Sequence, residues 1–484
     1  MQTVFEACEP RPEVLRGDLR EESFAARLRD VIERRADRVY GDPAVFFANT
    51  YPTDGLRTLL AEALGRLTGS RPDNNAIIRL ETAFGGGKTH NLIALYHLAS
   101  GDTPRAIAEP FVDPAIVPAP GQVKVAGIVG TDLDAEGGVT HGDVTAHTLW
   151  GELAWQVAER AGYELVADSD RSFAAPGTAM LERLLALIDD PPCLILLDEV
   201  ARHLRGASAV PTATGASNLA EQTVAFLVSL LEFAASREHV VVVLTLADSS
   251  DAFGRETDEL RTEIGDARKI SARTERVLTP TRETEISAIV THRLFARIDR
   301  DIARATADAY AEAYRRLVDQ GAELPERSTR AEYRDELVSD YPFHPELLTT
   351  LNRKVATIPN FQRTRGALRL LALTVRRLWE TRPSDAWTIH PDHVDLGVAA
   401  IADDLTSRLD RPTYRQVIEA DIASPRLGSL AHAQDLDRRS REEARPAFAG
   451  RVATAIFLHS ITQGTGAGVD PADAARARAR RPQR

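Results

Sequence analysis

The segment Phe84-Gly85-Gly86-Gly87-Lys88-Thr89 constrains the fold of this chain more than any other part of the sequence. It follows a short apolar run at residues 76–80 that predicts a strand, and it opens a helix predicted over residues 89–99. Glycines let backbone N–H groups curl around an anion, and the helix N-terminus adds the positive end of its dipole. A glycine turn followed by Lys-Thr by chance is the alternative. The strand before and the helix after favour a phosphate-binding loop.

The residue types of this loop predict how it would hold a nucleotide. Lys88 would reach the β- and γ-phosphates, and the Thr89 hydroxyl would ligate Mg²⁺. One departure from the usual pattern G-x-x-x-x-G-K-[ST] is present, because Thr82 stands where the first glycine belongs. The predicted nucleotide-binding residues are Phe84, Gly85, Gly86, Gly87, Lys88, Thr89 and His90.

Apolar runs rich in β-branched residues alternate with segments of helical periodicity. The runs lie at residues 76–80, 123–129, 193–197 and 240–246, with a weaker one at 276–278. The helical segments between them lie at 89–99, 143–160, 180–188 and 219–236. Apolar strands that alternate with helices are typical of a parallel sheet covered on both faces. The predicted fold class is therefore α/β, a parallel sheet sandwiched by helices.

The run at 193–197 ends in Asp198 and Glu199. An acid at the carboxyl end of a buried strand is where a nucleotide-bound Mg²⁺ needs an oxygen partner, so we assign Asp198 to the metal together with Thr89. Glu199 would orient and deprotonate the attacking water. For either acid alone, a strand end that meets solvent is the alternative. With a further strand between the two motifs in sequence, the arrangement resembles the ASCE branch of P-loop ATPases.

The strand at 240–246 contains a candidate sensor of the γ-phosphate. In AAA+ ATPases the strand beside the acid strand presents a polar residue that contacts the attacking water. Thr245 fits this role, with Asp248 as the alternative, and a threonine buried in a β-branched strand explains Thr245 equally well. None of the four lysines stands in an Asn-Lys-x-Asp signature, so ATP is favoured over GTP.

The domain boundaries follow from where the strand pattern starts and stops. Residues 1–70 form a predicted N-terminal helical segment, in which Thr53 caps a helix at 56–67. Residues 71–280 form the α/β core. After residue 280 the strands stop, and helices predicted at 281–298, 300–320, 345–353 and 365–380 make residues 281–400 an all-α lid domain. Residues 401–484 are predicted as a partial helical region with a disordered, arginine-rich tail.

Three arginines are candidates for contact with the γ-phosphate, because a planar guanidinium suits charge spread over phosphate oxygens. Arg273 or Arg276, near the last predicted strand, stands where AAA+ proteins often place an arginine finger. Arg369 ends a Gly-Ala-Leu-Arg motif that resembles the sensor 2 helix of the AAA+ lid, whose arginine reaches the γ-phosphate.

Four segments resemble one family, and the resemblance covers nearly the whole chain. They are ETAFGGGKTH (81–90), TLWGELAWQVA (148–158), YPFHPELLTTL (341–351) and FQRTRGALRLLA (361–372). The family consists of large prokaryotic AAA+-type ATPases, described mainly as a domain of unknown function, that occur in phage-defence islands and are similar to the ATPase subunits of BREX and Pgl systems. This resemblance implies partners in a defence complex, such as a DNA methyltransferase. Members are usually much longer, so the chain resembles their N-terminal ATPase portion.

Together these features predict an ATP hydrolase that uses ATP and Mg²⁺ and drives or regulates a DNA-associated defence complex. A non-hydrolysing nucleotide-dependent switch or scaffold and a DNA-translocating motor subunit are the alternatives. The net charge of −12 argues against a simple nucleic-acid coat, while DNA contact and homo-oligomers stay open. We found no run of the ~18 apolar residues that a bilayer requires and no secretory leader, so we expect a cytoplasmic protein.

Overall fold

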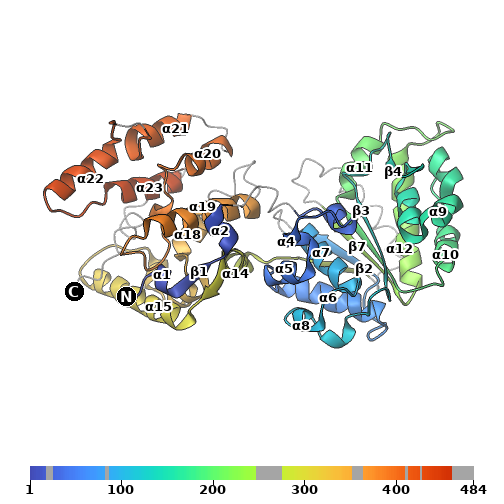
Figure 1. Ribbon diagram of the computed structural model, residues 1–484, viewed down its shortest axis with the longest axis horizontal. Helices are drawn as coiled ribbons and strands as arrows, with labels where there is room; N and C mark the ends of the chain where they lie inside the picture. Colours follow the sequence, from blue (N-terminus) through green and yellow to red (C-terminus); the bar gives the residue numbers. More distant parts are fainter. Residues whose placement is uncertain are drawn as a thin grey trace. The chain divides into compact units, whose positions relative to one another are not determined.

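The computed structural model describes residues 1–17, 26–81, 87–246, 275–351, 363–408, 413–425 and 428–460. The chain divides into two compact units, each described here by itself (Figure 1). The sheet unit is Ala26–Glu283. The helical unit combines Met1–Ala25 with Thr284–Arg484.

The sheet unit is built on a five-stranded parallel sheet in the order β3-β6-β7-β2-β8. Every residue of β6 and β7 is buried, as expected for central strands covered on both faces. Leu80 of β2 lies beside Thr245 of β7, and Leu197 of β6 lies beside Leu244 of β7, so the carboxyl ends of these strands meet. The predicted α/β class and its five strands are confirmed. They are β2 (Ile77–Glu81), β3 (Lys124–Val129), β6 (Cys193–Asp198), β7 (Val240–Leu246) and β8 (Glu275–Leu278).

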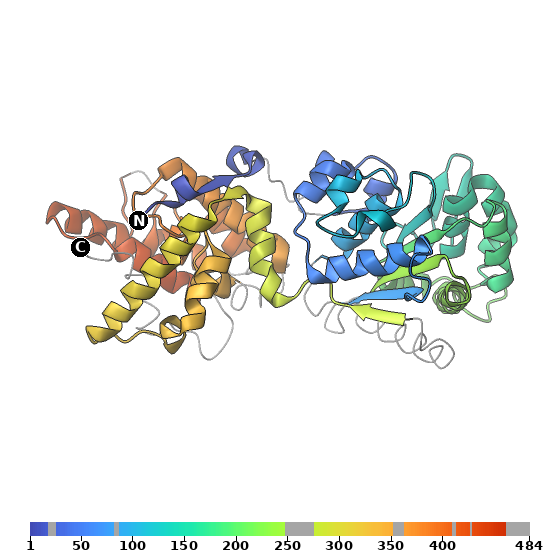
Figure 2. The same ribbon diagram turned by 90° about the horizontal axis from the view of Figure 1, so that it is seen from below.

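Helices cover both faces of the sheet (Figure 1 and Figure 2). On one face Leu92 joins a buried cluster with Ile78 and Val241. On the other, Trp150 joins a cluster with Ile195 and Val242, because alternate residues of a strand point to opposite faces. The first face carries α6 (Asp54–Leu67) and α7 (Lys88–Ala99), and the second carries α9 (Leu149–Ser172), α10 (Thr178–Ala186) and α12 (Leu219–Ser236). Shorter helices complete the unit: α3 (Leu28–Ile32), α4 (Arg38–Gly41), α5 (Pro43–Ala48), α8 (Arg105–Ala108) and α11 (Val200–Ala207).

Helix α12 is the one helix among the described residues that is long and apolar enough to cross a membrane by length and composition. The prediction that the chain holds no apolar run of this length did not identify this helix. In the structure Leu219, Phe226 and Leu230 of this helix are fully buried in the cluster that covers the sheet. This packing is that of a core helix against a sheet.

The helix predicted over residues 143–160 is wrong at its start. Residues 139–146 form a two-stranded hairpin instead, β4 (Val139–His141) and β5 (Val144–Ala146), with Gly142 at positive φ in the turn. Alternating β-branched residues favour this hairpin. The helix α9 begins only at Leu149, where the Thr148 side chain accepts from Gly151 N–H at 3.0 Å. It leaves helical geometry at Ala158 and Glu159.

The helical unit corrects the prediction that strands stop after residue 280. A strand β9 (Phe295–Ile298) pairs antiparallel with β1 (Cys8–Pro10), so the predicted helix at 281–298 ends early and the unit is not entirely helical. Its core includes Phe343, Leu371 and Val375, all fully buried. Its helices include α1 (Val4–Ala7), α2 (Pro12–Arg16), α14 (Ile286–Leu294), α15 (Arg300–Asp319), α16 (Glu326–Thr329), α17 (Ala331–Asp340), α18 (Pro345–Thr349), α19 (Arg363–Thr381), α20 (Ala399–Arg408), α21 (Thr413–Val417), α22 (His432–Glu442) and α23 (Ala449–Ser460).

Candidate functional site

Three of the predicted site residues meet where β6 and β7 end beside the first turn of α7. The Thr89 hydroxyl donates to Oδ2 of Asp198 at 2.7 Å. The Thr245 hydroxyl donates to Oδ1 of the same carboxylate at 2.6 Å. Asp198 itself is only 2% exposed. One buried carboxylate therefore joins the helix that starts with Lys88 to the neighbouring strand.

The electrostatics of Asp198 are unusual for a carboxylate. Burial raises the pKa of Asp198, because taking the charged form out of water costs free energy. The hydroxyl bonds from Thr245 and Thr89, the charge of Lys88 and the Glu199 N–H all act in the opposite direction. A buried carboxylate held by hydroxyl groups and near one ammonium group is a place where a further cation would be strongly stabilised.

The start of α7 depends on Gly87. This residue caps the helix in the left-handed region at φ 87°, which glycine adopts without strain. Its carbonyl accepts from the Asn91 N–H at 2.9 Å and from the Asn91 side-chain amide at 2.7 Å. A Cβ at this position would lie 3.0 Å from Thr281 Oγ1. Lys88 and Thr89 follow in the first turn, while Phe84, Gly85 and Gly86 lie outside the described residues.

Glu199 directly follows the buried strand and caps α11. It has φ 53°, an uncommon conformation for a non-glycine residue that costs on the order of 1 kcal/mol. Its N–H donates to Thr245 Oγ1 at 3.1 Å, which ties it to the Asp198 network. Its half-exposed carboxylate has Oε2 3.4 Å from Arg202 Nη1 on the next turn. Gly130 permits this backbone path, since a Cβ there would lie 2.4 Å from the Glu199 carbonyl oxygen.

His90 contacts the preceding helices of the sheet unit. Its Nε2 lies 2.9 Å from Thr50 Oγ1, and its ring stacks on Phe46 with centroids 4.5 Å apart. The Tyr40 ring meets it edge-on at 6.3 Å. His90 was predicted to contact the nucleotide, and this packing was not predicted. No local signal links residues 40–50 to α7, because the contacts join segments far apart in the chain.

The arginine candidates lie in different surroundings. Arg276 is the second residue of β8, and its guanidinium forms an ion pair with Glu62 of α6. In the helical unit, Arg369 of α19 has Nε 3.4 Å from Oδ1 of the buried Asp404. Arg273 and the alternative sensor Asp248 lie outside the described residues. The roles assigned to these arginines stay predictions.

Two family models match the chain. The one described as the DUF499 N-terminal domain matches residues 5–111 and 137–280, and the one described as the DUF499 second domain matches residues 281–471. The stretch between the two matched parts of the first model contains β3. No curated protein matches the chain.

Proposed function

The chain belongs to the DUF499 family, and we propose that it is an ATPase of the ASCE/AAA+ type that binds ATP together with Mg²⁺. One observation carries the proposal: the hydroxyls of Thr89 and Thr245 both donate to the buried Asp198 carboxylate, beside the glycine-capped start of α7. A hydroxyl in the first turn after a Gly-Lys pair and an acid at the end of a buried strand form the oxygen set of a nucleotide-bound metal.

The order of the strands supports this proposal. Strand β2 precedes the loop with Lys88, and β6, which ends in Asp198, is separated from β2 by β7. This strand, β7, is not the one that lies between the two motifs in the sequence, which is β3 at the edge of the sheet. A sheet with a strand between the lysine strand and the acid strand fits the proposed ASCE arrangement. Because β7 pairs with β6, the Thr245 hydroxyl reaches Asp198, as expected for a residue that senses the γ-phosphate.

The residues present fit Mg²⁺. The ion prefers oxygen ligands and is usually bound by one or two carboxylates or hydroxyls plus substrate phosphates. Thr89 Oγ1 and Asp198 Oδ2 supply such oxygens 2.7 Å apart, and a cation would offset the free-energy cost of burying the carboxylate. Mg²⁺, when bound, neutralises charge on the phosphate oxygens.

The chain's own residues then have distinct roles in hydrolysis. Lys88 and the N–H groups at the start of α7 bind the phosphates, and Glu199 accepts a proton from the attacking water. Thr245 orients that water, and its present bond to Asp198 keeps the hydroxyl in place. Arg369 would couple loss of the γ-phosphate to movement of the lid, and Arg273 or Arg276 would serve as a finger.

A nucleotide-dependent switch that hydrolyses slowly is the second candidate. The observation that favours it is the position of the Glu199 carboxylate, which lies 3.4 Å from Arg202 on its own helix. If Glu199 keeps this partner when ATP is bound, water would not be deprotonated efficiently. Turnover measurements on Glu199 and Arg202 variants separate the two candidates.

The output of the site is proposed from the resemblance described in the sequence analysis. We propose a role in a phage-defence complex with partners such as a DNA methyltransferase, and a location in the cytoplasm. Contact with DNA and assembly into homo-oligomers stay open.

Equilibrium binding of a fluorescent ATP analogue tests the nucleotide assignment. We expect Mg²⁺-dependent binding by the wild type and its loss in Lys88→Ala. Lys124→Ala, which removes a lysine from β3, is the matched control and should bind as the wild type does. Equal binding by the two lysine variants would contradict the assignment of the phosphate loop.

A further inference from the structure

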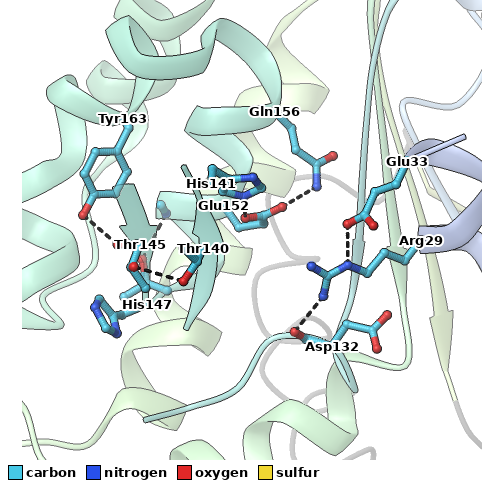
Figure 3. A network of polar contacts seen from close by, with 12 residues as sticks. Arg29, Glu33, Asp132, Thr140, His141, Thr145, His147, Glu152, Gln156 and Tyr163 are labelled. Atoms are coloured by element: carbon cyan, nitrogen blue, oxygen red, sulfur yellow. Dashed lines mark hydrogen bonds and ion pairs between the residues drawn. The ribbon is translucent and has the colours of Figure 1, made fainter. Parts of the chain in front are cut away.

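Strand β3 forms one edge of the sheet, and a cavity runs beside it. In the sheet order only β6 pairs with β3 among the described strands. A cavity of about 260 Å³ is lined by residues from both ends of β3, including Lys124 and Val129, and by Trp155 and Glu159 of α9. Figure 3 shows Arg29 and Glu33 on one side of this region and Glu152 and Gln156 on the other. The sheet edge therefore borders open space within the sheet unit.

A side-chain amide pairs with the backbone at this edge. Gly127 N–H donates to Gln156 Oε1 at 2.7 Å, and Gln156 Nε2 donates to the Gly127 carbonyl at 2.9 Å. The N–H and the C=O of Gly127 thus both face away from β6. Because N–H and C=O groups alternate sides along a parallel strand, the Val125 and Val129 backbone faces the same edge, where the Val129 carbonyl accepts from the Asp132 N–H at 3.0 Å. The Gln156 amide therefore makes the pair of hydrogen bonds that one residue of a neighbouring strand would make.

The charges around the cavity are mainly negative. The Arg29 guanidinium is engaged by Glu33 at 2.6 Å and by the Asp132 carbonyl at 3.1 Å. His141 contacts the Glu152 carboxylate at 2.7 Å and stacks on Trp155 with ring centroids 4.8 Å apart. The carboxylates that line the cavity are Glu33, Asp132, Glu152 and Glu159, against the basic residues Arg29, Lys124 and His141. The excess of carboxylates, with an aromatic wall, complements a basic chain.

We propose that the open edge of β3 docks an extended, basic peptide segment of a partner protein, which adds as a strand and displaces the Gln156 amide from Gly127. Main-chain hydrogen bonds would provide affinity, as in other cases of strand addition. An arginine or lysine side chain of the peptide would enter the cavity, with its stem against Trp155 and its charge facing Glu159. Complementary charge would select basic over acidic segments. The proposal does not depend on ATP hydrolysis.

The test uses fluorescence anisotropy of a short labelled peptide of alternating arginine and valine, added to the full chain. Three further probes separate the contributions: the same peptide N-methylated at alternate backbone amides, a peptide with glutamate in place of arginine, and free arginine amide. We expect saturable binding of the parent peptide and weaker binding by at least roughly tenfold of the N-methylated and acidic peptides. Arginine amide alone should compete poorly.

Two variants probe the two halves of the proposal. Gln156→Ala frees the Gly127 backbone and should tighten binding severalfold. Glu159→Gly removes a carboxylate and should weaken binding roughly tenfold. It should also fold well, because Glu159 has φ 49° and glycine tolerates that conformation. Asp168→Ala, at a carboxylate of α9 that is 99% exposed and outside the cavity, is the control and should bind like the wild type.

Several results would overturn the proposal. If the N-methylated peptide bound as tightly as the parent, the interaction would be charge attraction without strand pairing. If neither the wild type nor Gln156→Ala bound the parent peptide, Gln156 would only protect an edge against pairing. Full competition by arginine amide would identify a small organic cation as the ligand. Equal weakening by Asp168→Ala and Glu159→Gly would show that the cavity plays no part.

Discussion

Replacing Asp198 by asparagine should stabilise the metal-free protein while it removes the response to Mg²⁺ and ATP. Asparagine keeps the shape of the side chain. Its Oδ1 can still accept from the Glu199 N–H, and the side chain can still hydrogen-bond to Thr89 and Thr245, since hydroxyl groups both donate and accept. What changes is the charge, which burial opposes. A residue retained for a bound cation is expected to destabilise the fold when that cation is absent.

The expected magnitude follows from two opposing effects. Burying a carboxylate carries an effective penalty of several kcal/mol. The two hydroxyl bonds, at 2.7 and 2.6 Å, are each stronger by about 1 kcal/mol when the acceptor is charged. The net stabilisation of Asp198→Asn in metal-free buffer near pH 7 is therefore about 1–3 kcal/mol. For a unit of this size about 1 kcal/mol raises Tm by about 2–4 °C.

The pH dependence of this difference has a defined sign. The folded-state pKa of Asp198 lies above its ordinary value of 3.8. The native state therefore binds the proton more tightly than the unfolded state. The free-energy cost of burying the charged Asp198 carboxylate is absent below pH 3.8. This cost grows as pH rises through the folded-state pKa. The higher stability of Asp198→Asn relative to the wild type should therefore disappear on acidification. Tm measured in EDTA over a range of pH values checks this prediction.

Asp170 provides the matched control, because it is also fully buried. It accepts from the backbone N–H groups of His147 and Thr148 and from the hydroxyls of Thr148 and Tyr163. The backbone donors cannot reverse, so Asp170→Asn should destabilise by about 1–3 kcal/mol. The reasoning is refuted if Asp198→Asn melts below the wild type in EDTA, or if Mg²⁺ with ATP still raises its Tm as much as it raises that of the wild type.

Three further predictions concern residues around Asp198. Gly87→Ala should abolish binding of the ATP analogue and lower stability by about 1 kcal/mol, since alanine is strained at φ 87° and its Cβ would crowd Thr281; wild-type affinity would show that the loop geometry is irrelevant. Thr245→Val should leave analogue binding within about threefold but lower kcat at least roughly tenfold, and unchanged kcat in a turnover assay would remove Thr245 from the mechanism. Arg202→Ala should raise kcat by releasing Glu199 from its 3.4 Å partner, whereas a fall in kcat would mean that Arg202 assists the reaction.

Local sequence patterns predicted the elements that surround the site. Strand β7 was predicted over its full length, and the Thr53 cap of α6 is confirmed by its bond from Leu56 N–H at 3.1 Å. These features depend on neighbouring residues. The hairpin at residues 139–146 was missed, because its few alternating residues precede a strongly helical segment and were absorbed into it. The pairing of β1 with β9 was missed, because it joins segments from opposite ends of the chain.

The candidate site could be predicted in its chemistry but only partly in its contacts. A glycine-rich turn and an acid after a buried strand are readable from sequence, and so were Thr89 and Asp198. The contact of His90 with Phe46 and Thr50 was not readable, since it depends on how a preceding helix packs on α7. The amide of Gln156 on the edge of β3 was equally hidden, because a glutamine on a predicted helix carries no signal of its partner.

Steady-state ATP hydrolysis by the purified chain tests the central claim most directly, measured with Mg²⁺ and with EDTA, and beside Lys88→Ala and Glu199→Gln. The account predicts Mg²⁺-dependent turnover by the wild type that both variants lose, while Glu199→Gln still binds the ATP analogue. Wild-type turnover no faster than that of Glu199→Gln would contradict it.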